Sequence, residues 1–265
     1  MTAAGTNSYV VGREQLVVVD PGPAIDSHID ALAAQVGDRL AAIVVTHTHP
    51  DHSPAAKPLA DRTGAPLYGA LSYHEHFQDH TFAPDHVLVH DSCVPAGDMS
   101  LRAIHTPGHV DNHFCFLLEE HRIIMAGDHL MQGSTVVIAP PQGDMAEYIL
   151  SLQRLLEYQP DSIAPAHGQM MTQPAQEVAA LIKHRHAREE KIFDVCEAMG
   201  EASTDALLPR AYDDVDVSLH GIARYSLLAH LLKLERDQRV VRINSNGDED
   251  RLLDSADAPW QWRCC

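Results

Sequence analysis

The sequence contains no apolar run that approaches the roughly 18 to 20 residues needed to cross a membrane. Its beginning shows no basic segment followed by a long apolar one, so no secretory signal is predicted. The five cysteines among 265 residues form no spaced framework, which is typical of reduced intracellular thiols rather than of a disulfide scaffold. These absences predict a cytoplasmic protein without a membrane partner.

Positive charge is scarce as well, because 19 Lys and Arg stand against 37 Asp and Glu, a formal net charge of −18. Such a balance argues against a protein that mainly grips a nucleic-acid phosphate backbone. Histidine, by contrast, is abundant, with 19 residues. These histidines are either exposed polar residues or metal ligands, and their spacing has to separate the two explanations.

Short β-rich runs and short helical patterns alternate through the first part of the chain. The runs are rich in Val and Ile and are bounded by Gly, Pro, Asp or Asn. Strands are expected at Asn7–Gly12, Gln15–Asp20, Leu40–Thr46, Pro66–Gly69, Val87–His90, Ser100–His105, His113–Glu119, Arg122–Gly127 and Asp161–Ala166. Helices are expected at Ala24–Gln35, Pro54–Thr63 and Met145–Tyr158. This alternation predicts an α/β sandwich, and we assign residues 1–183 to it.

After Pro174 the sequence changes from short β-rich runs to longer helical patterns. Helical patterns are expected at Ala175–Met199, Thr204–Tyr212 and Leu219–Arg236, followed by a short strand at Val240–Ile243. Three helices and a β-wing are the outline of a winged-helix module, which we assign to residues 184–245. The polar, acidic and then aromatic tail, residues 246–265, is expected to be mostly disordered.

This module has little of the charge that a DNA reader needs. Residues 184–245 carry 9 Lys and Arg against 11 Asp and Glu. A winged helix that reads DNA normally presents a basic helix and wing. We therefore expect no specific DNA binding, and a role as a structural cap or homodimer element.

The densest group of histidines directly follows a predicted buried strand. Residues 46–52 read Thr-His-Thr-His-Pro-Asp-His. His47 and His49, two residues apart at the end of an extended segment, can converge on one ion. The turn that begins at Pro50 can place Asp51 and His52 beside a second ion. Packing explains neither the acid nor the density of imidazoles, so this motif predicts a metal site.

Three further motifs also follow predicted strands. They are Thr106-Pro-Gly-His109, Ala126-Gly-Asp128 and Ala164-Pro-Ala-His167-Gly168. Strands that end on one rim of a sheet sandwich would bring these side chains together. The nearby His105, His113 and His129 are expected to support the site or fill the core, and His74, His76, His80, His86 and His90 to lie mostly at the surface.

Together these motifs resemble those of the metallo-β-lactamase fold superfamily in its dinuclear hydrolase form, and residues 6–168 match them in order and spacing. The resemblance implies an αββα sandwich. It implies a first metal site of His47, His49 and His109, a second site of Asp51, His52 and His167, and Asp128 as the bridge. It also implies that Asp20 orients the ligands by hydrogen bonding.

Five His and two Asp suit two Zn²⁺ ions, although iron or manganese also fits mixed N/O ligands. Two such ions can share a hydroxide, which then acts as the nucleophile. Asp51 and Asp128 are the candidate catalytic residues, and Asp51 is the candidate to orient that hydroxide.

A closer resemblance, carried by GTNSYVVG, GDHLMQGSTVVIAPPQGDMAEYILSL and the winged helix, is to a lactamase-like group. That group includes a mitochondrial endoribonuclease and fungal thioesterases. We therefore expect hydrolysis of a small ester, thioester or lactone, with single-stranded RNA cleavage as the alternative that the charge disfavours. A β-lactamase is less expected, and a DNA-binding regulator least. Leu130, Met131, Val136, Val137 and Ile138 would either wall an acyl pocket or pack in the core.

Overall fold

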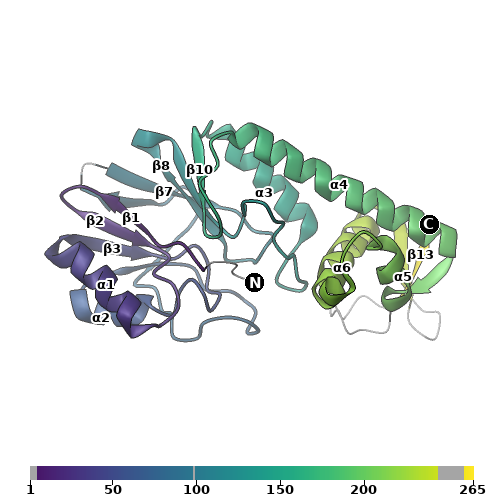
Figure 1. Ribbon diagram of the computed structural model, residues 1–265, viewed down its shortest axis with the longest axis horizontal. Coiled ribbons are helices and arrows are strands. Elements are labelled where there is room, and N and C mark those ends of the chain that lie inside the picture. The colour runs from purple at the N-terminus through teal and green to yellow at the C-terminus, as the bar shows by residue number, and fades with distance from the viewer. Residues whose placement is uncertain (1–4, 98, 244–259) are drawn as a thin grey trace.

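The computed structural model describes residues 5–97, 99–243 and 260–265. Its larger part is a sandwich of two sheets with helices on both outer faces (Figure 1). The first sheet contains, in spatial order, β1 (Tyr9–Gly12), β2 (Leu16–Val19), β3 (Leu40–Val44), β4 (Leu67–Gly69) and β5 (His86–Val87). The second contains β10 (Ser162–Pro165), β9 (Ile123–Gly127), β8 (Phe114–Leu118), β7 (Met99–His105) and β6 (Cys93–Ala96). The expected sandwich of two sheets and outer helices is confirmed.

The core has three apolar layers. Val17, Val44 and Phe116 belong to the layer between the two sheets. Ile29 of α1 (Asp26–Val36) and Leu59 of α2 (Ala56–Thr63) pack on the outer face of the first sheet. The outer face of the second sheet is covered by α3 (Met145–Glu157) and by α4 (Pro174–Met199). The strands of both sheets therefore alternate between two buried faces, and their Val- and Ile-rich sequences follow from this.

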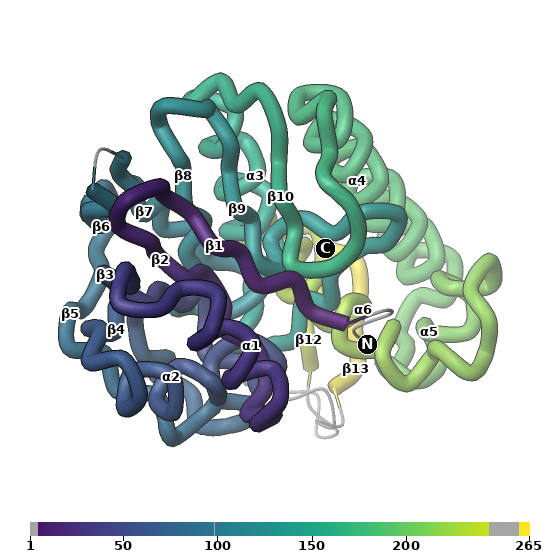
Figure 2. The backbone as a smooth tube through the Cα atoms, turned by 60° about the vertical axis from the view of Figure 1, so that its left-hand side comes forward, coloured from purple at the N-terminus to yellow at the C-terminus, as the bar shows by residue number. Residues whose placement is uncertain are grey.

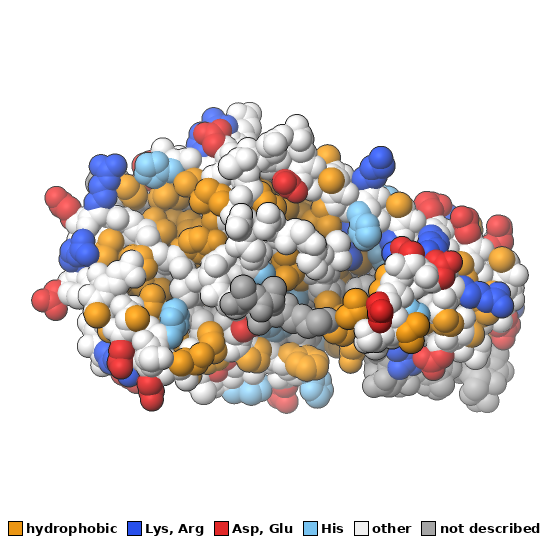
Figure 3. All heavy atoms as spheres, in the orientation of Figure 1, with side chains coloured by type: hydrophobic (Ala, Val, Ile, Leu, Met, Phe, Trp, Pro, Cys, Tyr) orange, Lys and Arg blue, Asp and Glu red, His pale blue; other side chains and the backbone are white. Residues whose placement is uncertain are grey.

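The N-terminal segment ties the two sheets together at one edge. The backbone N–H of Asn7 donates to the carbonyl of Ala166 at 2.8 Å, and the Tyr9 hydroxyl donates to the Pro165 carbonyl at 2.6 Å. Figure 2 shows β1 and the chain before it running alongside β10. An apolar hollow of about 350 Å³ lies beyond this crossing, lined by residues that include Val11, Met125 and Met170. Figure 3 shows hydrophobic side chains in a hollow on this side of the sandwich.

The C-terminal module shares α4 with the sandwich. Two further helices, α5 (Thr204–Ala211) and α6 (His220–Arg236), pack against the second half of α4 around a separate core. The small sheet beside them has the order β11 (Glu201–Ser203), β13 (Gln261–Cys264), β12 (Val240–Ile243). Short 3₁₀ turns complete the described elements: η1 (Gly37–Arg39), η2 (Glu119–His121) and η3 (Val217–Leu219). Within the described ranges, none of the helices is both long and apolar enough to span a membrane.

The expectation of a disordered tail is wrong for its last residues. Gln261–Cys264 form the central strand of the small sheet, antiparallel to both β11 and β12. The Trp262 side chain is fully buried, and its Nε1 donates to Thr204 Oγ1 at 3.0 Å. The acidic composition of the tail predicted disorder, but Trp260 and Trp262 at its end are buried and complete the core of the module. The remainder of the expected disordered tail, residues 246–259, lies outside the described residues.

Candidate metal centre

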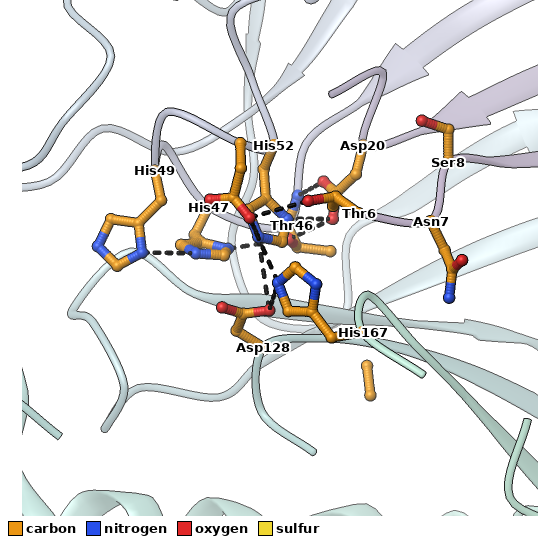
Figure 4. A network of polar contacts seen from close by, with 12 residues as sticks. Thr6, Asn7, Ser8, Asp20, Thr46, His47, His49, His52, Asp128 and His167 are labelled. Carbon is orange, nitrogen blue, oxygen red and sulfur yellow. Dashed lines mark hydrogen bonds and ion pairs between the residues drawn. The ribbon is translucent and has the colours of Figure 1, made fainter. Parts of the chain in front are cut away.

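All seven residues expected to bind metal lie together at the carboxyl ends of four strands. The segment Thr46–His52 follows β3, His109 follows β7, Asp128 follows β9 and His167 follows β10. Five of the seven residues are buried, and His49 and Asp51 are partly exposed. Figure 4 shows His47, His49, His52, Asp128 and His167 pointing toward a common centre. The structure thus joins parts of the sequence that are more than a hundred residues apart.

A first group consists of His47, His49, His109 and Asp128. His49 Nδ1 lies 2.9 Å from His47 Nε2 and 3.1 Å from His109 Nε2. The Asp128 Oδ2 atom lies 3.7 Å from His109 Nε2. Imidazole nitrogens at these distances share either a proton or a cation, and a tetrahedral zinc site would separate its nitrogen ligands by a similar distance, about 3.3 Å.

A second group consists of Asp51, His52 and His167. The Oδ2 atom of Asp51 lies 3.4 Å from His52 Nε2 and 3.3 Å from His167 Nε2. Asp128 reaches this group with its other oxygen, since its Oδ1 lies 3.4 Å from His52 Nε2 and 3.1 Å from His167 Nε2. The Asp128 carboxylate therefore faces both groups, as a bridging ligand would.

Asp20 holds one histidine of each group in place. Its carboxylate accepts from the Thr46 N–H and the Thr46 hydroxyl, both at 2.7 Å, and lies 2.9 Å from His52 Nδ1. Because the Thr46 hydroxyl gives its proton to Asp20, it accepts from His47 Nδ1 at 3.0 Å. Both histidines therefore carry a proton on Nδ1 and turn Nε2 toward the centre. The expectation that Asp20 orients the ligands agrees with this geometry.

The two remaining imidazoles in the cluster that use Nε2 are anchored by backbone carbonyls. His109 Nδ1 donates to the Val137 carbonyl at 2.8 Å, and His167 Nδ1 donates to the Gly5 carbonyl at 3.0 Å. Gly108 makes the position of His109 accessible, because a Cβ atom there would lie 2.3 Å from the Tyr148 Cα. A glycine is therefore required directly before this histidine.

Two supporting residues were not identified from the sequence as parts of the site. The Thr6 hydroxyl donates to Asp51 Oδ2 at 2.9 Å, and the neighbouring Gly5 carbonyl holds His167. The sequence signal for Thr6 is the Gly-Thr-Asn segment, which resembles the lactamase-like group but does not by itself indicate a contact with Asp51. His113, expected to support the site or fill the core, accepts the Asp128 N–H at its Nε2, 3.2 Å away, and its Nδ1 faces Thr106 Oγ1 at 2.9 Å.

The protonation states of the two groups differ. Burial and the neighbouring imidazoles hold the pKa of His47 well below its usual value and lower the pKa of His49 to about 3. Burial also acts to lower the pKa of His52, but Asp128 and Asp20 raise it well above the usual value. The same opposition, with hydrogen bonds to Asp128 and Asp51, raises the pKa of His167 to about 10.

The donor set fits metal ions. His52 Nε2 and Asp128 Oδ1 are buried and lie 3.4 Å apart without a hydrogen bond of good geometry between them. Both atoms face the second group, where a cation would satisfy them. Neutral imidazole nitrogens and carboxylate oxygens are ligands that zinc, iron and manganese accept.

The exposure of side chains distinguishes surface residues from core residues among the other candidates. His76, His80, His86 and His90 are exposed, as expected, and His74 is half-buried. Leu130, Val136 and Ile138 belong to the core under α3, so core packing accounts for these three. A cleft of about 450 Å³ between the Pro140–Met145 segment and α6 is lined by none of the seven cluster residues.

Comparisons with known proteins agree with this architecture. The Metallo-beta-lactamase superfamily description matches residues 1–167, and the Beta-lactamase associated winged helix domain description matches residues 203–250. A "Beta-lactamase-like protein 2 homolog" of Drosophila melanogaster is 27% identical, over 94% of this chain and 88% of its own. An "Atrochrysone carboxyl ACP thioesterase" of Aspergillus fumigatus is 26% identical, over 91% of this chain and 79% of its own.

Two solved structures show the same fold. A metallo-beta-lactamase family protein from Thermus thermophilus, TTHA1429, superposes with a TM-score of 0.77 at 19% identity, over 98% of this chain and 94% of its own. TTHA1623, solved in a di-iron-bound form, superposes with a TM-score of 0.53 at 27% identity, over 63% of this chain and 89% of its own. The chain therefore belongs to the metallo-β-lactamase superfamily, as a metal-dependent hydrolase that carries the associated winged-helix domain.

Proposed function

We propose that the protein hydrolyses a small ester, thioester or lactone at a dinuclear centre held by the seven residues of the cluster. Zinc is the proposed metal, and iron or manganese are the alternatives. Two bound ions supply a nucleophile from water at neutral pH and polarise the bond to be broken. The His and Asp cluster supports the hydrolase assignment, and the substrate class rests on the surface charges described below.

The proposed roles of the chain's own residues follow from their surroundings. His47, His49 and His109 present neutral nitrogens, and Asp128 lies between the two groups. Asp51 is the more open carboxylate, since 28% of its side chain is exposed against 11% for Asp128. Although burial opposes it, the hydrogen bond to His167 and the charge of His52 hold the pKa of Asp51 below its usual value. An ionised carboxylate that is partly exposed can accept a hydrogen bond from water and orient that water for attack.

The ion pairs made by Lys and Arg side chains support a small acyl substrate over single-stranded RNA. In the described part of the C-terminal module, Lys and Arg side chains lie against carboxylates of the same protein: Arg188 and Lys191 on Asp214, Lys233 on Glu189 and Asp237, Arg236 on Asp144, and Arg239 on Glu190. Figure 3 shows basic and acidic side chains side by side over this module. Cations neutralised in this way do not form the continuous groove that a single-stranded nucleic acid requires. A compact acyl substrate needs no such groove.

The named thioesterase among the relatives supports the same ranking. The proposed partner is accordingly a small molecule. RNA is disfavoured, and no specific DNA or membrane partner is proposed. The five free cysteines, two of them buried, support a cytoplasmic location.

The test measures kcat/KM for a small thioester and for single-stranded RNA on one zinc-loaded preparation at two salt concentrations. We expect faster turnover of the thioester, with little effect of salt. Metal analysis of the same preparation should give about two ions per chain. Efficient RNA cleavage that falls steeply with salt, with acyl substrates near background, would establish the endoribonuclease alternative instead.

A further inference from the structure

Arg185 is a charged side chain buried inside the protein, on the middle turn of α4. Only 4% of the residue is exposed. Its Nη2 atom donates to the Val136 carbonyl at 2.5 Å, and its guanidinium carbon lies 5.2 Å from the centre of the Tyr148 ring. Burying a guanidinium is costly, so contacts of this kind need a reason beyond filling space.

The segment that Arg185 contacts also holds a residue of the metal cluster. Val136 is followed by Val137, whose carbonyl accepts the Nδ1 proton of His109 at 2.8 Å. Two consecutive carbonyls therefore each accept a hydrogen bond, one from Arg185 and the other from His109. A displacement of the Val136 carbonyl moves the Val137 Cα with it, because both belong to one planar peptide, and the Val137 carbonyl is bonded to that Cα.

The Tyr148 ring links Arg185 to the other end of the cluster. The Tyr148 hydroxyl donates to the His129 carbonyl at 2.8 Å, directly after Asp128, and the two rings lie 4.8 Å apart. Arg185 thus contacts the segment that holds His109 directly, and it reaches the segment after Asp128 through the Tyr148 ring.

We infer that Arg185 is a positioning residue for the first group, through which the α4 helix of the winged-helix module sets the orientation of His109. This inference rests on the proposed function in that it takes His109 as a metal ligand. It assigns the C-terminal module a part in metal binding that needs no contact between the module and the substrate.

The chain provides a matched control three residues further along α4. Arg188 is also buried, at 9% exposure, and its guanidinium carbon lies 4.4 Å from the centre of the Tyr212 ring. Its hydrogen bonds, however, go to Ala211 and Asp214 within the C-terminal module. Arg188→Met should therefore weaken the module without disturbing the segment behind His109.

The experiment measures Zn²⁺ affinity by chelator competition in the full chain, with Arg185→Met, Arg185→Lys and Arg188→Met. Each variant is made both alone and together with His167→Gln, which removes a donor of the second group so that the first group is measured by itself. Outer partners of metal ligands usually contribute about 10- to 100-fold in affinity. We expect about a 10-fold loss for Arg185→Met, recovery for Arg185→Lys, which keeps a donor for the Val136 carbonyl, and no loss for Arg188→Met.

A second measurement uses Co²⁺ in place of zinc, because the visible spectrum of cobalt reports the geometry of its ligands. We expect the spectrum to change in Arg185→Met and to stay unchanged in Arg188→Met. Equal losses in these two variants, or a lysine variant as weak as the methionine variant, would overturn the inference. So would wild-type affinity and spectrum in Arg185→Met, while the dinuclear proposal would stand. A wild-type protein that binds no metal overturns both. If Arg185→Met does not fold, Arg185→Gln takes its place with the same expected loss.

Discussion

His49 and His167 lie in the same cluster, yet their pKa values move in opposite directions. Burial and the neighbouring imidazoles His109 and His52 lower the pKa of His49 to about 3. His167 is also subject to burial, but its hydrogen bonds with Asp128 and Asp51 raise its pKa to about 10. In the metal-free protein the first group is therefore a set of open lone pairs, whereas the second group is already occupied by protons. The two groups should load with metal by different chemistry.

The largest expected effect comes from removing the residue that the two groups share. Asp128→Ala should lower activity by more than the roughly 100-fold that is the upper range for outer partners of metal ligands, because it deletes a carboxylate that faces both groups. The bound-metal content should fall below that of the wild type while circular dichroism stays close to it. Asp111→Ala, which removes a carboxylate that only ties down Ser72 and Tyr73, is the control. Wild-type metal content in Asp128→Ala would show that this carboxylate is not a bridge.

Asp20→Asn should have the next largest effect, about 10- to 100-fold in metal affinity. The substitution keeps the shape but replaces an acceptor with a donor that faces the Thr46 groups or His52 Nδ1. Both groups should weaken, whereas Thr46→Val, which removes the hydroxyl between Asp20 and His47 but keeps the contact of Asp20 with His52, should weaken mainly the first group. Calorimetric titration with Zn²⁺ distinguishes the two variants. Equal losses in both groups for Thr46→Val would contradict this division of labour.

The number of protons released when metal binds should distinguish the first group from the second. At pH 7 the second group should release about two protons when it binds an ion, from His52 and His167, and the imidazoles of the first group should release none. Titration in buffers of different ionisation enthalpy measures this number. His167→Gln should reduce the release by about one proton. Release that is unchanged in this variant would mean that His167 is neutral before metal binds.

The smallest expected effect is on the folding stability of the protein after a chelator has removed its metal (the chelated protein). The raised pKa of His167 stabilises the fold below the unfolded value of about 6.5, and this contribution is lost as the pH rises through about 10. The lowered pKa of His49 acts in the opposite sense, with a contribution that is present above about 6.5 and is lost as the pH falls toward about 3.

Stability of the chelated protein should therefore pass through a maximum near neutral pH, with slopes of at most about 1.4 kcal/mol per pH unit for each proton. Urea denaturation at several pH values measures both limbs. His167→Gln should flatten the alkaline limb and His49→Gln the acid limb. If His167→Gln instead flattens the acid limb, the assignment of the two groups is reversed.

The cluster could be predicted from the sequence because each of its residues directly follows a strand that the apolar pattern reveals. His47, His109, Asp128 and His167 carry their own local signal in this way. Arg185 could not be predicted, because its contact is with a residue 49 positions away and nothing local marks it. Thr6 contacts a residue 45 positions away, and only the Gly-Thr-Asn segment marks it.

The short strand β6 and the strand β13 were missed for different reasons. In β6, Pro95 and exposed side chains obscure the β pattern. In β13, an acidic stretch before Trp260 suggested disorder, although burial of Trp262 now indicates that Trp262→Ala should cost about 3–5 kcal/mol. A deletion after Arg242 removes β13 and should for the same reason unfold the module.

The helix α4 is a single rigid element of 26 residues that both domains share. Its Arg185 contacts the sandwich, and its Arg188 contacts the C-terminal module. One residue inserted between them would turn the distal half by about 100° and advance it by about 1.5 Å. Loops at the surface of this protein can change length without such a penalty. The two halves of α4 are therefore held in one register, and an insertion between Arg185 and Arg188 should break the contacts of at least one of them.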